Sequence, residues 1–245
     1  MSTHRVHATV ATVAALLVLA SGTVGCGNDS TTTKPTTTSA TTGSTTTSST
    51  PVTTTSTRAP TVVQTDSAVW PFVSSTTRFT DPVKAATEFA VTYLGFVNPV
   101  VGAYVGGDSR SGEVDIRANT RATATTTVMV RKLAPDETWW VLGAATTHLQ
   151  LQSPSWDAPI TSPVTVSGQS TASEATVNVE IRQDGSLAPI GTDFVMGGSN
   201  GTMGPFSKAV AFTTPTARRG AIVFRMPSSD GNGPIEAGVI RVQFP

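Results

Sequence analysis

Cysteine and histidine are almost absent from this sequence. The 245 residues include one cysteine, Cys26, and three histidines, of which only His148 lies beyond the first ten residues. One cysteine excludes an intrachain disulfide and a cysteine-rich metal site, and one histidine in the body of the chain cannot build a multi-histidine zinc or iron centre. We therefore expect no resident metal, no cofactor and no buried catalytic thiol.

Charged side chains are also scarce. They make up 13% of the residues, and the 16 basic and 16 acidic groups leave a formal net charge of zero. Without a positive excess the chain has little to attract a phosphate backbone, so nucleic acid is excluded as an expected partner. The remaining composition is rich in Thr, Ser, Val and Ala, which favours strands and polar linkers over charged helices.

The N-terminal 25 residues have the pattern of a secretory signal peptide. Arg5 precedes the apolar run ATVATVAALLVLASGTVG, and residues 1–25 together give the short basic region and apolar core that such peptides share. The run is close to the shortest length that spans a bilayer as a helix. An uncleaved membrane anchor and simple secretion are therefore the alternatives to cleavage at the end of this segment.

The residues around Cys26 favour lipidation. The small residues Val24 and Gly25 precede Cys26, and Gly27 follows it. This stretch resembles the lipobox of bacterial lipoproteins, in which the cysteine thiol is diacylated and becomes the new N-terminus, although Thr23 stands where that family usually has leucine. The resemblance implies attachment through Cys26 to the outer face of the cytoplasmic membrane or cell envelope. Two or three acyl chains would hold the protein stably.

Residues 26–65 are expected to be a disordered tether. Between residues 30 and 57, 22 of 28 positions are Ser or Thr, with Lys34 as the one charge. Such a segment cannot bury enough apolar surface to offset its ordering entropy. From Cys26 to Pro60 it would reach roughly 30 Å as a coil and about 100 Å fully extended. O-glycosylation of the tract and a plain polar spacer remain alternative hypotheses.

Residues 66–152 are predicted to form a small α+β domain. In FTDPVKAATEFAVTYLGF, Asp81 can cap a helix, Pro82 suits its first position and Gly95 its end. The stretches EVDIRA, TTTVMVRKL and TWWVLGAATTHLQLQS then alternate with a period of two. One helix packed on about four antiparallel strands fits this order.

Trp139 and Trp140 are the candidate binding residues. Consecutive strand residues point to opposite faces, so only one ring can lie under the helix. The other ring either packs against the neighbouring domain or against WPF at 70–72, or it forms an exposed surface for a sugar ring or a partner protein. His148, in TTHLQLQ, is interpreted as a solvated strand residue, because nothing near it in the sequence supplies a nucleophile or an acid partner.

Residues 153–245 are predicted to form a β-sandwich of about seven short strands. The blocks SPVTVSG, EATVNVEI, MGPFS and GAIVFRMPSSDGNGPIEAGVIRVQF resemble the immunoglobulin-like domain of bacterial spore germination, a module found beside the GerMN domain and in lipoproteins of actinobacteria. The resemblance covers residues 157–245 and implies an immunoglobulin-like fold in an extracytoplasmic protein. It carries over no catalytic residue, and the module also occurs in bacteria that form no spores.

Three classes of function remain open. The one we favour is a non-enzymatic cell-envelope lipoprotein that displays an interaction or scaffold module, with a cell-wall glycan or an envelope protein as partner. The second is a cell-wall hydrolase, for which Glu113 with Asp115, or Asp136 with Glu137, are the nearest carboxylate pairs, although such a pair must converge across a cleft. The third is a small-ligand binder with a cavity between helix and sheet.

One loop offers oxygen ligands for a cation. In SSDGNGPIE these are Asp230, Asn232 and Glu236, but the full calcium-loop pattern is missing. We interpret the segment as a glycine-rich turn between two strands.

Overall fold

The computed structural model describes residues 65–172 and 174–245. The predicted signal peptide, Cys26 and nearly all of the predicted tether lie outside the described residues. The described residues belong to one compact unit. Within the described part of the chain, no helix is long and apolar enough to cross a membrane.

The helix begins and ends where the sequence predicts. The Asp81 carboxylate accepts hydrogen bonds from the backbone N–H groups of Val83 and Lys84, at 2.8 and 3.1 Å, and Pro82 opens the helix. Gly95 ends it with a φ of 82°, a left-handed conformation that glycine adopts without strain. The helix is not uniform, because α1 (Pro82–Glu88) passes into a π-helical segment, η2 (Phe89–Leu94), which the apolar pattern does not predict.

Nine strands form the larger sheet, in the order β1-β2-β3-β4-β13-β12-β8-β9, with β6 paired to β13. The first four are β1 (Val100–Gly106), β2 (Ser111–Arg117), β3 (Thr126–Leu133) and β4 (Thr138–Ala145). The others are β6 (Ala158–Pro159), β8 (Thr176–Gln183), β9 (Pro189–Met196), β12 (Arg219–Pro227) and β13 (Pro234–Gln243). A single register pair, Ala144 opposite Val239, joins β4 to β13.

The second sheet lies opposite the C-terminal half of the first. It contains β5 (Leu149–Ser153), β7 (Val164–Ala172), β10 (Gly198–Ser199) and β11 (Gly204–Val210). β5 pairs with β7, although the sequence analysis grouped its residues with the preceding strands. The alternation of LQLQ predicts a strand but does not identify its partner. The fold is thus mostly β, with one α-helix and an immunoglobulin-like sandwich, as predicted.

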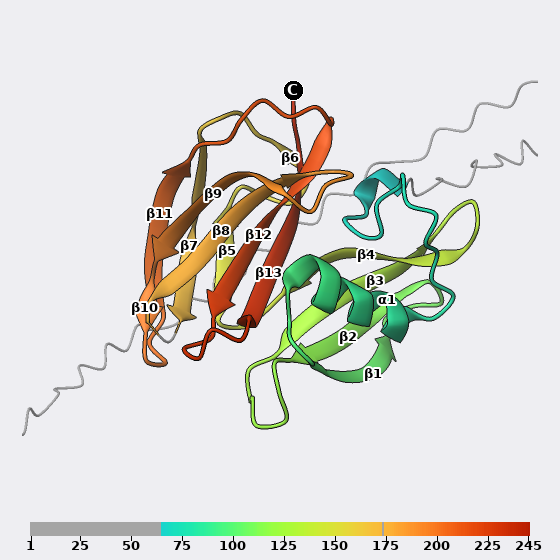
Figure 1. Ribbon diagram of the computed structural model, residues 1–245, viewed down its shortest axis with the longest axis horizontal. Coiled ribbons are helices and arrows are strands. Elements are labelled where there is room, and N and C mark those ends of the chain that lie inside the picture. The colour runs from blue at the N-terminus through green and yellow to red at the C-terminus, as the bar shows by residue number, and fades with distance from the viewer. Residues whose placement is uncertain (1–64, 173) are drawn as a thin grey trace, which may run out of the picture. The chain divides into compact units, whose positions relative to one another are not determined.

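Two hydrophobic cores lie on opposite faces of β12 and β13. The sandwich core fills the space between the two sheets and includes Ile222, Phe224 and Val242. The helix-side core lies under α1, which contacts β1 to β4 (Figure 1), and its members include Phe89, Val128 and Val239. Residues from both sides of the predicted boundary at 152/153 therefore share the helix-side core, and the boundary itself stays a prediction.

Candidate binding surfaces

Both predicted binding tryptophans are interior residues. Trp139 belongs to the helix-side core, with its ring centroid 5.3 Å from that of Tyr104. Trp140 lies on the other face of β4, only 1% exposed, and its Nε1–H donates to the Thr138 hydroxyl at 3.1 Å. The two rings do take opposite faces, but neither offers an exposed stacking surface to a sugar or a protein. Of the two alternatives for the second ring, the structure shows the packed one.

A second cover explains the burial of Trp140. Its ring packs with Ala68, Leu133 and Leu142, and the Arg78 guanidinium lies 5.0 Å from the ring centroid. The cover comes from residues before the helix, which the period-two pattern of β4 cannot reveal. The alternative partner WPF packs elsewhere, since its two aromatic rings contact the helix-side core.

The exposed tryptophan is Trp156, which the sequence analysis did not single out. Its side chain lies in the loop before β6 and is 43% exposed. The ring rests on Gly143, where a Cβ would come within 2.9 Å of the indole and 3.4 Å of the Met129 side chain. The Val239 carbonyl oxygen would be closer still, at 2.7 Å, so glycine at 143 permits the close approach of both β13 and the indole. A tryptophan flanked by Pro154 and Pro159, outside any strand pattern, was the available signal.

A shallow depression of about 350 Å³ lies on the helix-free side of the sheet, and Met129, one of the residues that line it, lies near Gly143 as the Trp156 indole does. We call the depression and the indole together the Trp156 face. Its lining includes Val105, Glu113, Met129, Arg131 and Leu142. Val105, Glu113 and Met129 are register neighbours across β1, β2 and β3, and Met129 pairs with Gly143 under the indole. The face therefore combines apolar side chains, a carboxylate, a guanidinium and one exposed aromatic ring.

The carboxylate pairs considered for hydrolysis do not converge across a cleft. Glu113 and Asp115 project from alternate positions of β2 on one exposed surface, and Asp115 accepts a 2.8 Å hydrogen bond from the Thr127 hydroxyl. Asp136 forms an ion pair with Arg78 at 3.2 Å. Glu137 pairs with Arg110 at 2.7 Å. In the part of the chain that the structure describes, fully buried side chains such as Phe89, Leu94 and Ile116 pack together in the helix-side core.

His148 has an acid partner that the sequence could not show. It lies in the turn between β4 and β5, not in a strand, and its side chain is 46% exposed. Its Nδ1 is 2.7 Å from a carboxylate oxygen of Glu236, a residue 88 positions away whose side chain is 2% exposed. The other Glu236 oxygen accepts a hydrogen bond from the Thr146 hydroxyl. This network ties the β4–β5 turn to β13.

The candidate oxygen ligands of the glycine-rich turn are engaged in hydrogen bonds within the protein. Asp230 accepts hydrogen bonds from the Ser228 hydroxyl and the Asn232 backbone N–H, and these bonds lower the pKa of Asp230 to about 2. Glu236 is committed to Thr146 and His148. Among the described residues, no group of three or more His, Cys, Asp or Glu side chains could hold a metal ion.

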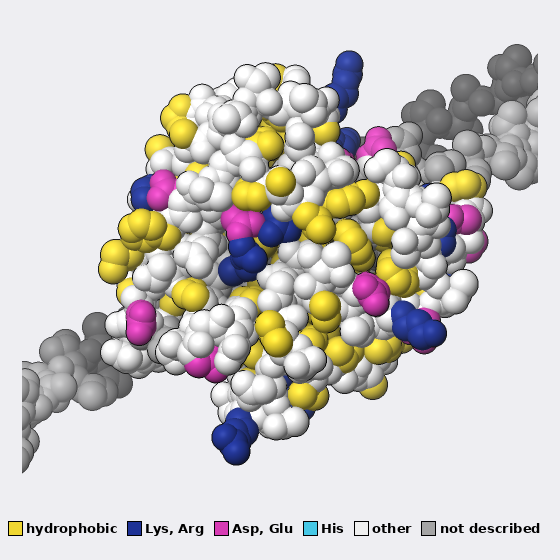
Figure 2. Space-filling model, in the orientation of Figure 1, with side chains coloured by type: hydrophobic (Ala, Val, Ile, Leu, Met, Phe, Trp, Pro, Cys, Tyr) yellow, Lys and Arg dark blue, Asp and Glu magenta, His cyan; other side chains and the backbone are white. Residues whose placement is uncertain are grey.

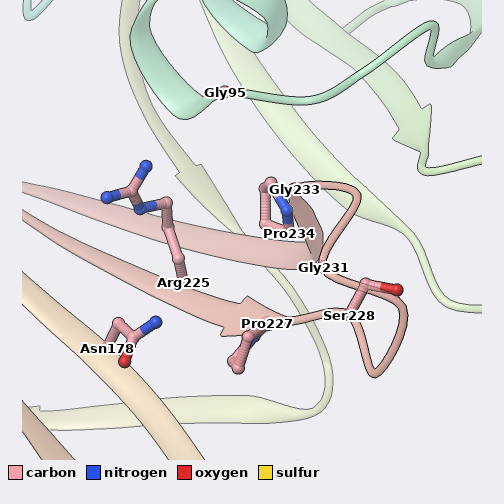
Figure 3. Close-up of a pocket in the computed structure, with 8 residues that line it drawn as sticks. All are labelled: Gly95, Asn178, Arg225, Pro227, Ser228, Gly231, Gly233 and Pro234. Carbon is pink, nitrogen blue, oxygen red and sulfur yellow. The ribbon is translucent and has the colours of Figure 1, made fainter.

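A groove of about 280 Å³ lies between the end of the helix and the β12–β13 hairpin (Figure 3). Arg225 and Asn178, which are register partners on β12 and β8, line it together with Ser228, Pro227 and Pro234. In Figure 3 the guanidinium and the amide project from neighbouring strands, while the glycine-rich turn closes the other side. The groove is lined by polar groups that could bind a small ligand.

Two arginines and one glutamate, Arg182, Arg225 and Glu180, form a linked cluster of ion pairs, and Arg225 also lines this groove. Arg182 donates from Nε and Nη2 to one Glu180 oxygen at 2.9 and 2.5 Å, and Arg225 pairs with the other oxygen. Arg182 also donates to the carbonyl of Tyr93 at 2.7 Å, so it satisfies an orphan acceptor at the helix end. Burial raises the pKa of Tyr93 to about 12 and lowers the pKa of both arginines. Basic and acidic groups meet near the centre of the view in Figure 2.

Comparison with protein families identifies the C-terminal part of the chain. Residues 148–232 match the family model described as the immunoglobulin-like domain of bacterial spore germination. Comparisons with curated proteins and with solved structures gave no match. The matched segment begins at His148 and so includes β5, in agreement with the pairing of β5 and β7. A domain of this type is a non-catalytic fold and suggests an interaction module.

Proposed function

We propose that this protein is a non-enzymatic lipoprotein of the bacterial cell envelope that binds a cell-wall glycan through the Trp156 face. The lipobox-like stretch around Cys26 supports a lipid anchor, and the Thr/Ser-rich residues 30–57 support a spacer between membrane and folded unit. The immunoglobulin-like domain supports an interaction role. The chain then serves to hold a binding surface outside the membrane.

One observation carries the binding half of this proposal, namely the exposed indole of Trp156, which lies against Gly143. Large aromatic side chains are usually at least partly covered, and an exposed one beside a depression marks a recognition surface. A flat indole offers apolar area to the C–H surface of a sugar ring, while the Glu113 carboxylate accepts hydrogen bonds from hydroxyl groups. An envelope protein is the less favoured ligand, because the face combines one ring with uncommitted polar groups rather than a broad apolar surface.

The anchoring half predicts a change of location when Cys26 is replaced. The Cys26→Ser chain should leave the membrane fraction and appear in soluble extracytoplasmic or culture fractions, because serine cannot be acylated by the thiol chemistry. Fractionation with immunoblotting measures this, and Cys26→Ser should also lose labelling by a fatty-acid analogue. A variant with Ser21→Ala upstream of the cysteine serves as control and should stay in the membrane. Unchanged membrane association of Cys26→Ser would show an uncleaved anchor instead.

The binding half predicts that retention on cell-wall glycan depends on Trp156. A pull-down on purified envelope fractions measures this retention for the wild-type chain and its Trp156→Ala variant.

A further inference from the structure

Arg131 on the Trp156 face has no partner within the described part of the chain. Its half-buried side chain forms no ion pair and no hydrogen bond there, and its Nε–H is buried without an acceptor. A guanidinium that is incompletely solvated gains more from an added acceptor than one in open water. Because Arg131 lines the depression, its two outer nitrogens remain as donors for a ligand that binds there.

Glu113 offers an acceptor in the same depression. On the β2–β3 ladder Glu113 is opposite Met129 and Arg131 is opposite Ser111, so Glu113 and Arg131 are diagonal neighbours. Diagonal neighbours lie about 7 Å apart, within reach of long side chains. Among the described residues, however, Glu113 pairs neither with Arg131 nor with any other group. A donor and an acceptor therefore line one depression without satisfying each other.

The charges around the depression favour a neutral ligand over an acidic one. Arg131 and Glu113 balance each other, and Arg110 is already paired with Glu137 at 2.7 Å. The neighbouring Asp108 carboxylate accepts hydrogen bonds from two backbone N–H groups, at 2.7 and 2.6 Å. These hydrogen bonds, together with the Arg131 charge, lower the pKa of Asp108. With Asp108 ionised, the surroundings have no positive excess to attract an acidic sugar.

We propose that the glycan bound at the Trp156 face is built from N-acetylated amino sugars, with an acetamido group between Arg131 and Glu113. An amide is neutral and offers one acceptor and one donor. Its carbonyl oxygen accepts from the Arg131 guanidinium, and its N–H donates to the Glu113 carboxylate. Met129 and Leu142, which line the same depression, supply apolar surface for the acetyl methyl group. This inference rests on the proposed function and names the class of sugar that the face selects.

The test compares two sugar tetramers that differ in one substituent. The full chain in mild detergent is titrated calorimetrically with the chitin-type tetramer of N-acetylglucosamine and with the cellulose-type tetramer of glucose, which has a hydroxyl in place of each acetamido group. The N-acetylated tetramer should bind at least about tenfold more tightly, because a hydroxyl at that position cannot reach both charged groups. Equal affinities would overturn this inference and leave glycan binding intact. No binding of either tetramer would contradict the proposed function as well.

Arg131→Met separates sugar selection from folding. Methionine keeps an unbranched apolar stem but has no N–H donor, so this variant should bind the two tetramers with affinities within about twofold of each other. Since Arg131 has no partner among the described residues, the melting temperature should not fall. Arg117→Met, which removes the same charge from β2 outside the depression, is the matched control and should keep the wild-type preference. A folded Arg131→Met chain that still prefers the N-acetylated tetramer would refute the site.

Two further measurements identify the class of ligand. Trp156→Ala should weaken the binding of both tetramers by a similar factor, because the indole contacts sugar surface that the two tetramers share. N-acetyl-alanine methylamide, which has amide groups but no sugar ring, should bind more weakly than the N-acetylated tetramer. Tighter binding of this peptide analogue would show that the face takes a peptide, and it would overturn the proposal.

Discussion

Replacing Asp184 by alanine should lower the free energy of unfolding by about 3 kcal/mol, the lower end of the range for breaking a buried ion pair from one side, since the Asp184 side chain is itself 34% exposed. Asp184 holds both terminal nitrogens of Arg241, at 2.5 and 2.6 Å. The Arg241 side chain is completely buried, so the variant would leave a guanidinium in the interior without its counter-charge. Arg241 also donates to the Asp66 carbonyl, which ties the start of the described chain to β13.

Chemical denaturation of wild-type and variant chains measures this loss. Asp193→Ala is the matched control, because Asp193 pairs at 2.5 Å with Lys208, whose side chain is 38% exposed, whereas that of Arg241 is completely buried. Surface pairs of that kind contribute about 0–1 kcal/mol, so the control should unfold near the wild-type midpoint. A similar small effect for both variants would show that the Arg241 charge is solvated and does not organise the interior.

Trp140→Ala should destabilise the protein by about 3–5 kcal/mol, as expected for removing a large buried aromatic ring. The ring is 1% exposed, packs against Leu133 and Leu142, and carries the Arg78 guanidinium over its face. The substitution therefore leaves a cavity and an uncovered cation. Because Leu142 packs against Trp140 and also lines the Trp156 face, a loss of ligand binding in this variant would not by itself show a contact between Trp140 and the ligand.

Trp156→Ala is the control for the loss of stability expected of Trp140→Ala. Its ring is 43% exposed, so truncation should cost about 1 kcal/mol or less in urea denaturation. Equal destabilisation by the two substitutions would mean that the Trp156 ring is a packing residue, and the proposed binding face would lose its main support.

The sequence predicted local structure well and distant partners poorly. Asp81, Pro82 and Gly95 mark the helix ends because capping depends on residues within one turn. The π-helical segment within that helix has no such local code. The period-two patterns correctly indicated strands, yet the pairing of β5 with β7 and the joining of β4 to β13 depend on contacts far apart in the chain.

The candidate residues show the same limit. Alternation correctly placed Trp139 and Trp140 on opposite faces, but the cover over Trp140 comes from Ala68 and Arg78, which no pattern near β4 reveals. His148 gained its partner from Glu236, 88 residues away. Trp156 was missed because its exposure depends on a glycine in a neighbouring strand. Binding surfaces assembled from several strands are thus visible only after the fold is known.

The most direct test of the account is retention of residues 61–245 on purified cell-wall glycan, with and without Trp156. The fragment, its Trp156→Ala variant and a Leu187→Ala control are first checked for folding by circular dichroism, since Leu187 is another exposed apolar residue, 40% exposed and not part of the Trp156 face. We predict that wild type and Leu187→Ala are retained and that folded Trp156→Ala is washed out. Equal retention of all three, or no retention of the wild type, would contradict glycan binding through the Trp156 face.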